Sequence, residues 1–290
     1  MAGRPGDKPL LGVVMMLASL LLMAVLSALV KSVSAREPLA EVLFFRFAGS
    51  LIPLAWMLRR SGGISLLRTD QPLEHALRSL FGIMGIATYF YALSAIPIAD
   101  ATALTYSAPL FIMLFSIVFL GERVGAAKWL SALIGFVGVF LIASPRGHGV
   151  SMGTLAAVAS AVFGALVSVW IRRLSQADGA LTIAIIYNAT GAAVSMLGLL
   201  IIGWELDLNI DLAMMVTVGL IAGAQQFLMT SSFRYAEASV IAPLEYALLV
   251  FAGLIGWLFW DEVPTDNALI GAVIITVSGV FVVRLGRARA

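Results

Sequence analysis

Ten long apolar stretches, separated by short polar connections, limit how this chain can fold more than any other feature. They fall at residues 10–30, 38–58, 76–96, 99–120, 127–143, 153–171, 180–202, 212–234, 237–259 and 267–284. A transmembrane helix needs about 20 consecutive apolar residues, whereas a spanning β-strand is about 10 residues of alternating hydrophobicity. The pattern therefore predicts an all-α polytopic membrane protein with ten transmembrane helices.

The composition supports a lipid environment and excludes several kinds of chemistry. Of the 290 residues, 61% are hydrophobic and 12% are charged, and the charged share is half the roughly 25% of a soluble domain. Cysteine is absent, so disulfides, thiolate nucleophiles and cysteine-based metal sites are excluded. The short polar segment 1–9 precedes an apolar run of 21 residues, which is too long for a signal-peptide core. We expect this run to be the first transmembrane helix.

The distribution of basic residues predicts the orientation of the chain. If the N-terminus lies inside, 13 of the 18 Lys and Arg residues fall in inner segments and three in outer loops. The remaining two, Arg46 and Arg78, lie within apolar stretches. This asymmetry follows the positive-inside rule, so we expect both termini to be cytoplasmic and the protein to lie in the inner membrane of a bacterium.

An internal repeat divides the chain into segments 1–145 and 146–290. At a shift of 141 residues, Ser27 corresponds to Ser168, and the segment 138–140 corresponds to 279–281 with the same sequence, Gly-Val-Phe. Between these points the shift falls to 137, because the second copy has a shorter connection. Each copy holds five spans, an odd number, so the second copy enters the membrane with inverted topology. Inverted repeats are typical of secondary transporters, which bind substrate near the midplane between the halves.

Several short motifs resemble the EamA-type members of the drug/metabolite transporter superfamily along essentially the whole chain. They lie at Phe44–Arg46, Pro109, Leu120–Arg123, Leu133–Val139, Ala242–Tyr246, Asp261–Pro264 and Leu269–Ala272. Two departures stand out: Trp260–Asp261 replaces a small-Gly pair, and Tyr187 stands opposite Arg46 in the repeat. The resemblance implies that helices 1–4 and 6–9 surround a central cavity, with helices 5 and 10 peripheral. It also implies export of small metabolites, often amino acids.

Candidate substrate-binding residues are polar or aromatic positions within spans, judged with the repeat in mind. In the fourth span Thr102, Tyr106 and Pro109 have the spacing of one helix face. The alternatives are that such residues pack the core or hydrogen-bond neighbouring helices. The candidates are Tyr89, Thr102, Tyr106, Gln225, Gln226, Ser239, Glu245 and Tyr246.

Ionisable residues within spans form a further group, because charge is costly in a bilayer. Glu245 could bind a substrate ammonium, carry a coupling proton, or be a neutral acid bonded to a helix. Arg46 could attract a substrate carboxylate, or pair structurally with Glu41 or Asp100. Residues expected to shape helices or to gate the pathway are Arg46, Pro109, Pro243, Glu122 and Glu262.

An enzyme and a channel are the rival classes, and the sequence favours neither. The two histidines, His75 and His148, lack metal-ligand spacing, and no hydrolase or nucleotide-binding motif occurs. We therefore expect no catalytic residues, no metal and no cofactor, and transport that runs on gradients. No filter-like loop or ring of charge suggests a channel. A non-transporting membrane subunit remains a further alternative.

The expected function is export of amino acids, with aromatic and apolar ones favoured, by alternating access between the two inverted repeats. The alternative is uptake or exchange of a larger metabolite, such as a nucleotide-derived or vitamin-like compound. The expected partners are a small-molecule substrate and the lipid bilayer, without nucleic acid. A homodimer through helices 5 and 10 is also expected, on outward-facing small residues such as Gly135, Gly138, Gly271 and Gly279.

Overall fold

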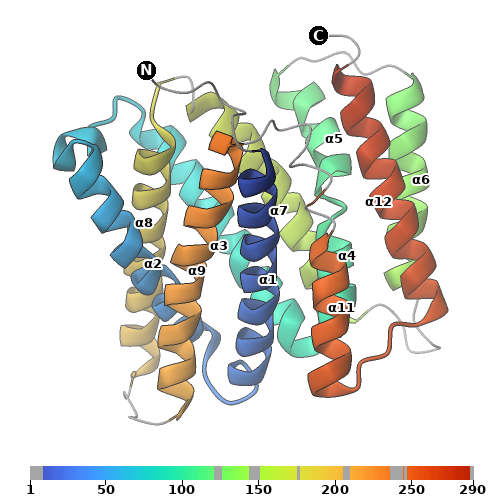
Figure 1. Ribbon diagram of the computed structural model, residues 1–290, viewed down its shortest axis with the longest axis horizontal. Helices are drawn as coiled ribbons and strands as arrows, with labels where there is room; N and C mark the ends of the chain where they lie inside the picture. Colours follow the sequence, from blue (N-terminus) through green and yellow to red (C-terminus); the bar gives the residue numbers. More distant parts are fainter. Residues whose placement is uncertain are drawn as a thin grey trace. The chain divides into compact units, whose positions relative to one another are not determined.

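The structure is a computed structural model that describes residues 9–120, 126–143, 151–174, 177–204, 210–235, 244 and 247–287. Helices dominate these residues, and no β-strand occurs among them (Figure 1). The helices are α1 (Pro9–Val33), α2 (Leu39–Ser61), the 3-10 helix η1 (Gly63–Leu67), α3 (Pro72–Ala95), α4 (Ile98–Thr105), α5 (Ala108–Leu120), α6 (Ala126–Ala143), α7 (Met152–Leu174), α8 (Ala180–Ile202), α9 (Ile210–Tyr235), α11 (Ala247–Trp260) and α12 (Asp266–Arg287).

The predicted all-helical membrane fold is confirmed at the level of individual helices. Each of the ten apolar stretches overlaps a helix or a pair of helices. Within the described residues, seven segments are long and apolar enough to cross a membrane, and two further apolar helices are shorter. The count of ten spans and the inverted repeat remain predictions.

Proline marks where several of these helices begin. Pro38 and Pro97 directly precede α2 and α4, and Pro72 stands in the first turn of α3. Proline suits these positions because the first turn of a helix does not use its backbone N–H groups. The connections are correspondingly short, and they leave most of the chain within helices.

The fourth predicted span is broken into α4 and α5 at Tyr106 and Ser107. Pro109 has no N–H to donate to residue 105, and its ring disfavours a helical carbonyl four residues earlier. The Ser107 hydroxyl instead donates to the Leu104 carbonyl at 2.6 Å. The expectation that Thr102, Tyr106 and Pro109 share one continuous helix face is therefore wrong.

The chain forms two compact units, each assembled from both halves of the sequence. Unit 1 comprises residues 1–68 and 180–260, with α1, α2, η1, α8, α9 and α11. Unit 2 comprises residues 69–179 and 261–290, with α3 to α7 and α12. The chain therefore passes between the units at 68/69, 179/180 and 260/261.

Within unit 1, α2 packs against both α8 and α9 (Figure 1). Leu54 and Leu58 of α2 form a buried cluster with Ala184 and Ile185 near the start of α8. A Cβ atom at Gly198, near the end of α8, would instead lie 3.8 Å from Ala40 at the start of α2. The two helices therefore run antiparallel.

Glycine allows α2 and α9 to approach closely. A Cβ atom on Gly219 of α9 would lie 2.9 Å from the Gly49 Cα atom and would clash with the Phe45 carbonyl oxygen. One turn later a Cβ atom on Gly223 would clash with the Pro53 ring. Small residues at such contacts let helix backbones meet in a membrane, so the glycines of α9 set the position of α2.

Unit 2 has two corresponding helix contacts. The Ser160 hydroxyl of α7 donates to the Gly85 carbonyl of α3 at 2.9 Å. Helices α6 and α12 pack where a Cβ atom on Gly138 would lie 2.8 Å from the Gly271 carbonyl oxygen. The expectation that Gly135, Gly138 and Gly271 face outward toward a second copy is wrong, because all three are buried in unit 2. Gly279 of α12 lies outside the residues whose burial the structure describes.

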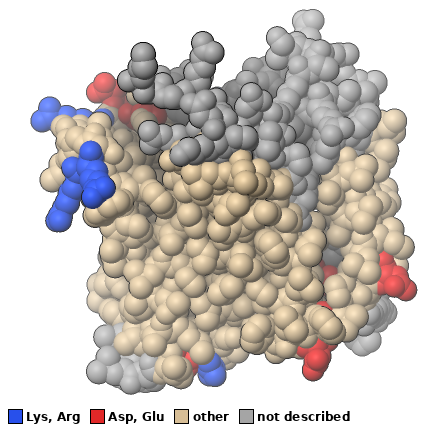
Figure 2. Space-filling view, in the orientation of Figure 1, with Lys and Arg blue, Asp and Glu red and all other residues tan. Residues whose placement is uncertain are grey.

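The described surface is largely apolar. Most of the described atoms in view in Figure 2 are neither acidic nor basic, and the coloured side chains lie near the margins. Large hydrophobic residues are widely exposed on the helices of both units, for example Ile201 on α8 and Phe140 on α6. Exposed apolar helix surface of this extent is what a lipid environment requires.

Candidate functional site

Arg46 lies on α2 inside a predicted span and has a neutral hydrogen-bond partner. Its Nη1 atom donates to the Oδ1 atom of Asn188 on α8 at 3.1 Å. Its guanidinium carbon lies 4.7 Å from the centre of the Phe47 ring and 5.7 Å from the centre of the Tyr187 ring. We refer to these four residues, Arg46, Phe47, Tyr187 and Asn188, as the Arg46 centre.

Asn188 is fully buried and held in one orientation. Its Nδ2 atom donates to the Ala184 carbonyl at 2.8 Å, which directs the amide oxygen toward Arg46. The Arg46 Nε atom is enclosed and has no hydrogen-bond partner among the described residues. The hydrogen-bond partner of Arg46 among the described residues of unit 1 is Asn188, and the pairing of Arg46 with Glu41 or Asp100 stays a prediction.

The contacts of the Arg46 centre form a reciprocal pair. At the repeat shift of 141 residues, Arg46 corresponds to Tyr187 and Phe47 corresponds to Asn188. Arg46 bonds to Asn188, and Phe47 packs edge-on against Tyr187 with ring centres 5.3 Å apart. The two contacts would therefore exchange with one another under the two-fold axis that the predicted inverted repeat requires.

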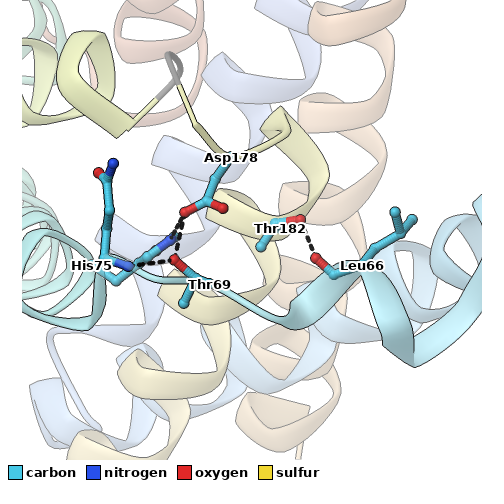
Figure 3. Close-up of polar contacts among 6 residues, drawn as sticks. Leu66, Thr69, His75, Asp178 and Thr182 are labelled. Atoms are coloured by element: carbon cyan, nitrogen blue, oxygen red, sulfur yellow. Dashed lines mark hydrogen bonds and ion pairs between the residues drawn. The ribbon is translucent and has the colours of Figure 1, made fainter.

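A second polar cluster lies in unit 2, at the two ends of its long continuous segment (Figure 3). The Asp178 Oδ2 atom accepts a hydrogen bond from the Thr69 hydroxyl at 2.6 Å and contacts the His75 Nε2 atom at 2.8 Å. These two hydrogen bonds lower the pKa of Asp178 from its usual value of 3.8, and the bond from Thr69 has the larger effect. We call Thr69, His75 and Asp178 the Asp178 clasp.

The ends of the neighbouring segments in unit 1 are also joined. The Thr182 hydroxyl at the start of α8 donates to the Leu66 carbonyl in η1 at 2.8 Å (Figure 3). Thr182 is buried, and its bond satisfies a backbone carbonyl in the connection after α2. Side-chain bonds therefore secure the chain on both sides of the crossings at 68/69 and 179/180.

Two of the predicted substrate-binding residues meet in unit 2. The hydroxyl groups of Tyr89 on α3 and Thr102 on α4 lie 3.3 Å apart, and both residues are buried. Tyr106, the third candidate of this unit, caps the end of α4 beside the break between α4 and α5. The three candidates therefore gather near the discontinuity of the fourth span.

The candidates of unit 1 that the structure describes lie on α9. Gln225 and Gln226 are both partly exposed. The Gln225 Nε2 atom reaches the Met229 sulfur at 3.8 Å, whereas Gln226 makes no hydrogen bond to any described residue. A partly exposed mid-helix amide without a partner among the described residues can bind another polar group.

Glu262 lies after α11 and belongs to unit 2. Its Oε2 atom accepts a hydrogen bond from the Ile98 N–H group, the first residue of α4, at 3.0 Å. A carboxylate at a helix N-terminus satisfies a free N–H group and complements the helix dipole. The other candidates, Glu122, Ser239, Pro243, Glu245 and Tyr246 together with the Pro109 side chain, lie outside the described residues.

The sequence analysis did not single out Asn188, Thr69 or Asp178. Asn188 carried a usable signal, since it is a lone amide in the apolar run Ile183–Ala189. The two clasp residues carried none, because Thr69 and Asp178 stand 109 positions apart in ordinary polar loops. Among the described residues no group of three or more His, Cys, Asp or Glu is placed to hold a metal.

Comparison with known proteins shows that this chain is similar to transporters. The model of the EamA-like transporter family matches residues 10–144 and, separately, residues 151–284. A solved crystal structure aligns with a TM-score of 0.64 and 26% identity, covering 96% of this chain and 97% of the other.

Curated relatives are similar over most of their length. The pseudopaline exporter of Pseudomonas aeruginosa is 33% identical over 92% of this chain and 94% of its own. A riboflavin transporter of Rhizobium johnstonii is 28% identical over 85% of this chain and 82% of its own. An S-adenosylmethionine uptake transporter of Rickettsia bellii is 28% identical over 84% and 83%, respectively.

Proposed function

The chain belongs to the EamA-like transporter family, and from this premise we propose that it is a secondary transporter that exports small metabolites, above all amino acids with aromatic or apolar side chains. As a family member it is a multi-pass membrane protein that transports small molecules, and it is not an enzyme. The proposed location is the inner membrane of a bacterium, with both termini cytoplasmic. The proposed domains are the repeats 1–145 and 146–290, built of ten spans in all.

The observation that carries the mechanism is the antiparallel packing of α2 on α8. These helices are the second spans of the two proposed repeats, since residue 39 corresponds to residue 180 at the shift of 141. Two copies of one motif related by a two-fold axis in the membrane plane place their corresponding spans antiparallel. The cluster of Leu58 with Ala184, opposite the approach of Ala40 to Gly198, supports this inversion.

The remaining helix contacts support the same inversion. The pairing of α1 with α9 in unit 1 has its counterpart in the pairing of α7 with α3 in unit 2, because spans 1 and 8 exchange with spans 6 and 3. The pairing of α6 with α12 is its own counterpart. We infer that the halves exchange conformations and open the pathway to one side of the membrane and then to the other.

The proposed substrate-binding residues are those within interrupted or polar parts of the spans. Discontinuous helices form the sites of many secondary transporters, and the break at Tyr106 and Ser107 lies beside the Tyr89–Thr102 pair. Gln226 adds a partly exposed amide on α9. Gln225, Ser239, Glu245 and Tyr246 complete the proposed set, with Arg46, Pro109, Pro243, Glu122 and Glu262 as helix-shaping or gating residues.

Counterflow in proteoliposomes tests this proposal. Vesicles loaded with an unlabelled mixture of amino acids should take up labelled phenylalanine, tyrosine or leucine saturably, and the uptake should fall at least tenfold in Gln226→Ala. Thr217→Ala, on the exposed face of the same helix, is the matched control and should transport normally. An absence of saturable counterflow for every amino acid would remove the amino-acid proposal.

A second candidate function is uptake or exchange of a larger metabolite. The names of the relatives favour it, because riboflavin and S-adenosylmethionine are both larger than a single amino acid, and two of the three relatives are not named exporters. Adding labelled riboflavin and S-adenosylmethionine to the same counterflow assay separates the two functions. Counterflow of these compounds without counterflow of amino acids would establish the second candidate.

Proton coupling is proposed for Glu245, an acid within a predicted span. An imposed pH gradient should drive net transport by the wild-type protein but not by Glu245→Gln, which keeps the size of the side chain and removes its proton exchange. Counterflow, which needs no net proton movement, should survive in the variant. Equal responses of both proteins to the gradient would exclude this role for Glu245.

A further inference from the structure

Arg46 is a cation whose setting within unit 1 calls for an anion. Arginine within a membrane span normally pairs with an acid or lines a functional pathway. Here its hydrogen-bond partner within the described part of unit 1 is the neutral oxygen of Asn188. An amide dipole compensates a full positive charge only in part, so the Arg46 centre retains net positive charge in a low-dielectric setting.

The unused donors of Arg46 have the geometry that a carboxylate needs. A guanidinium group carries five N–H donors in a planar fork, and the Arg46 hydrogen bond to Asn188 uses Nη1. Nε and Nη2 form the edge that binds the two oxygens of a carboxylate side by side, and the Nε atom of this edge has no partner among the described residues. The Nε atom is enclosed, so binding there requires the opening of the pathway that alternating access provides.

The surroundings hold the guanidinium group in place without neutralising it. The rings of Phe47 and Tyr187 lie within cation–π distance, and Asn188 cannot turn away without breaking its bond to the Ala184 carbonyl. These contacts restrict the side chain to one orientation. A preorganised monocation of this kind suits a planar monoanion, and a carboxylate fulfils both conditions.

The reciprocal contacts place the Arg46 centre near the proposed two-fold axis. Arg46–Asn188 and Phe47–Tyr187 exchange with one another under the repeat shift. An axis that lies in the membrane plane runs through the bilayer midplane, where inverted-repeat transporters bind substrate. We propose that Arg46, oriented by Asn188, is the carboxylate-binding residue of the transport pathway and restricts its substrates to carboxylate-bearing metabolites. This inference rests on the proposed transport function.

The test compares acids with their amides as ligands. Counterflow is measured for phenylalanine, tyrosine and leucine, with each acid or its amide as competitor, and for labelled riboflavin, which has no carboxylate. Wild-type protein should prefer the acid over the amide at least tenfold. Arg46→Gln should lose that preference to within twofold, and Asn188→Asp should do the same because its own carboxylate occupies Arg46. Arg46→Lys should keep part of it.

Arg36→Gln is the matched control. Arg36 forms an ion pair with Asp211 at 2.6 Å in the same unit, so its variant should keep the tenfold preference. Unchanged preference in Asn188→Asp would overturn the inference, as would wild-type transport of riboflavin or the amides without the acids; both results leave the transporter intact. Failure of every compound to show saturable counterflow would contradict the proposed function itself, and with it this inference.

Discussion

The Arg46 centre of unit 1 and the Asp178 clasp of unit 2 are both small polar clusters in an apolar protein, but they balance charge in opposite ways. Asp178 receives two side-chain hydrogen bonds, one of them from a histidine, and its pKa is lowered accordingly. Arg46 receives one neutral oxygen, and its Nε atom has no partner among the described residues. The Asp178 carboxylate is hydrogen-bonded within its unit, whereas the hydrogen-bond partner of Arg46 among the described residues of unit 1 is a neutral amide.

The difference separates a structural cluster from a binding cluster. A carboxylate that accepts hydrogen bonds from side chains of its own unit stabilises the parts of the chain that it joins, here the two ends of residues 69–179. A cluster with unused donors is destabilising by itself, because each buried unsatisfied group costs about 1–3 kcal/mol. Substitutions in the clasp should therefore change stability, and substitutions in the Arg46 centre should change transport.

The largest loss of transport is expected from a substitution that displaces α2, the helix that carries Arg46. Gly219→Ala places a Cβ atom against the Phe45 carbonyl and 2.9 Å from the Gly49 Cα atom, so α2 and α9 must separate. Overpacking of this kind costs about 1–3 kcal/mol, and we expect a lower folded yield and at least a tenfold loss of counterflow. Gly253→Ala, with no described atom within 4 Å of its new Cβ atom, is the control. Equal behaviour of the two variants would show that the close approach does not matter.

The clasp should respond through stability. Asp178→Ala leaves the buried His75 Nε2 atom and the Thr69 hydroxyl without their acceptor, at a cost of about 2 kcal/mol in the free energy of unfolding. Asp178→Asn keeps one oxygen acceptor and should lose about half as much. Thermal unfolding in detergent measures both, and the KM of the folded fraction should stay at the wild-type value. A changed KM with unchanged stability would show that the clasp acts in transport and not in stability.

In the Arg46 centre a substitution that introduces a carboxylate should raise stability, whereas removal of the Asp178 carboxylate from the clasp lowers it. Asn188→Asp gives Arg46 an anionic partner and loses the bond to the Ala184 carbonyl, so we expect a net gain of about 1 kcal/mol. Asn188→Ala removes the partner entirely and should lose about the same amount. Thermal unfolding of the two variants under identical conditions decides the matter. A stability loss in Asn188→Asp as large as that in Asn188→Ala would mean that Arg46 needs no anion.

The smallest effect concerns pH. The folded pKa of Asp178 lies below its unfolded value of 3.8, so the ionised carboxylate stabilises the protein fully above the unfolded pKa and loses this contribution as the pH falls through the folded pKa. Between pH 5 and pH 8 the titration of Asp178 should therefore not change the difference in melting temperature between wild type and Asp178→Asn. Below about pH 4 this difference should shrink. A difference that persists unchanged at pH 3 would contradict the assignment.

Much of the helical structure could be predicted from the sequence, because a bilayer requires long apolar runs and these are visible without a structure. The break in the fourth span was less accessible: Pro109 signalled a distortion, but two separate helices also depend on the bond of Ser107 to Leu104. Helix partners were not predictable, since the register of α2 on α9 depends on a backbone approach at Gly219 that hydrophobicity does not encode.

The polar clusters show the same limit. Arg46 stood out because charge is rare in a span, but its partner did not. Asn188 corresponds to an apolar residue, Phe47, in the predicted repeat, so no matching polar position in the first half marked it. The clasp joins a threonine, a histidine and an aspartate that are unremarkable in sequence and meet only once the chain has folded.

The discontinuous make-up of the two units has a consequence for synthesis on the ribosome. Unit 1 needs residues up to 260, and unit 2 needs residues beyond it, so neither is complete until translation has passed that point. Helix α1 begins about 200 residues before its partner α9, a delay of about 10–40 s at elongation rates of about 5–20 residues per second. During this interval α1 lacks its partner α9, whereas α3 and α7 are both already synthesised and can pair. A chain that stops before residue 260 therefore contains two incomplete units and no complete one.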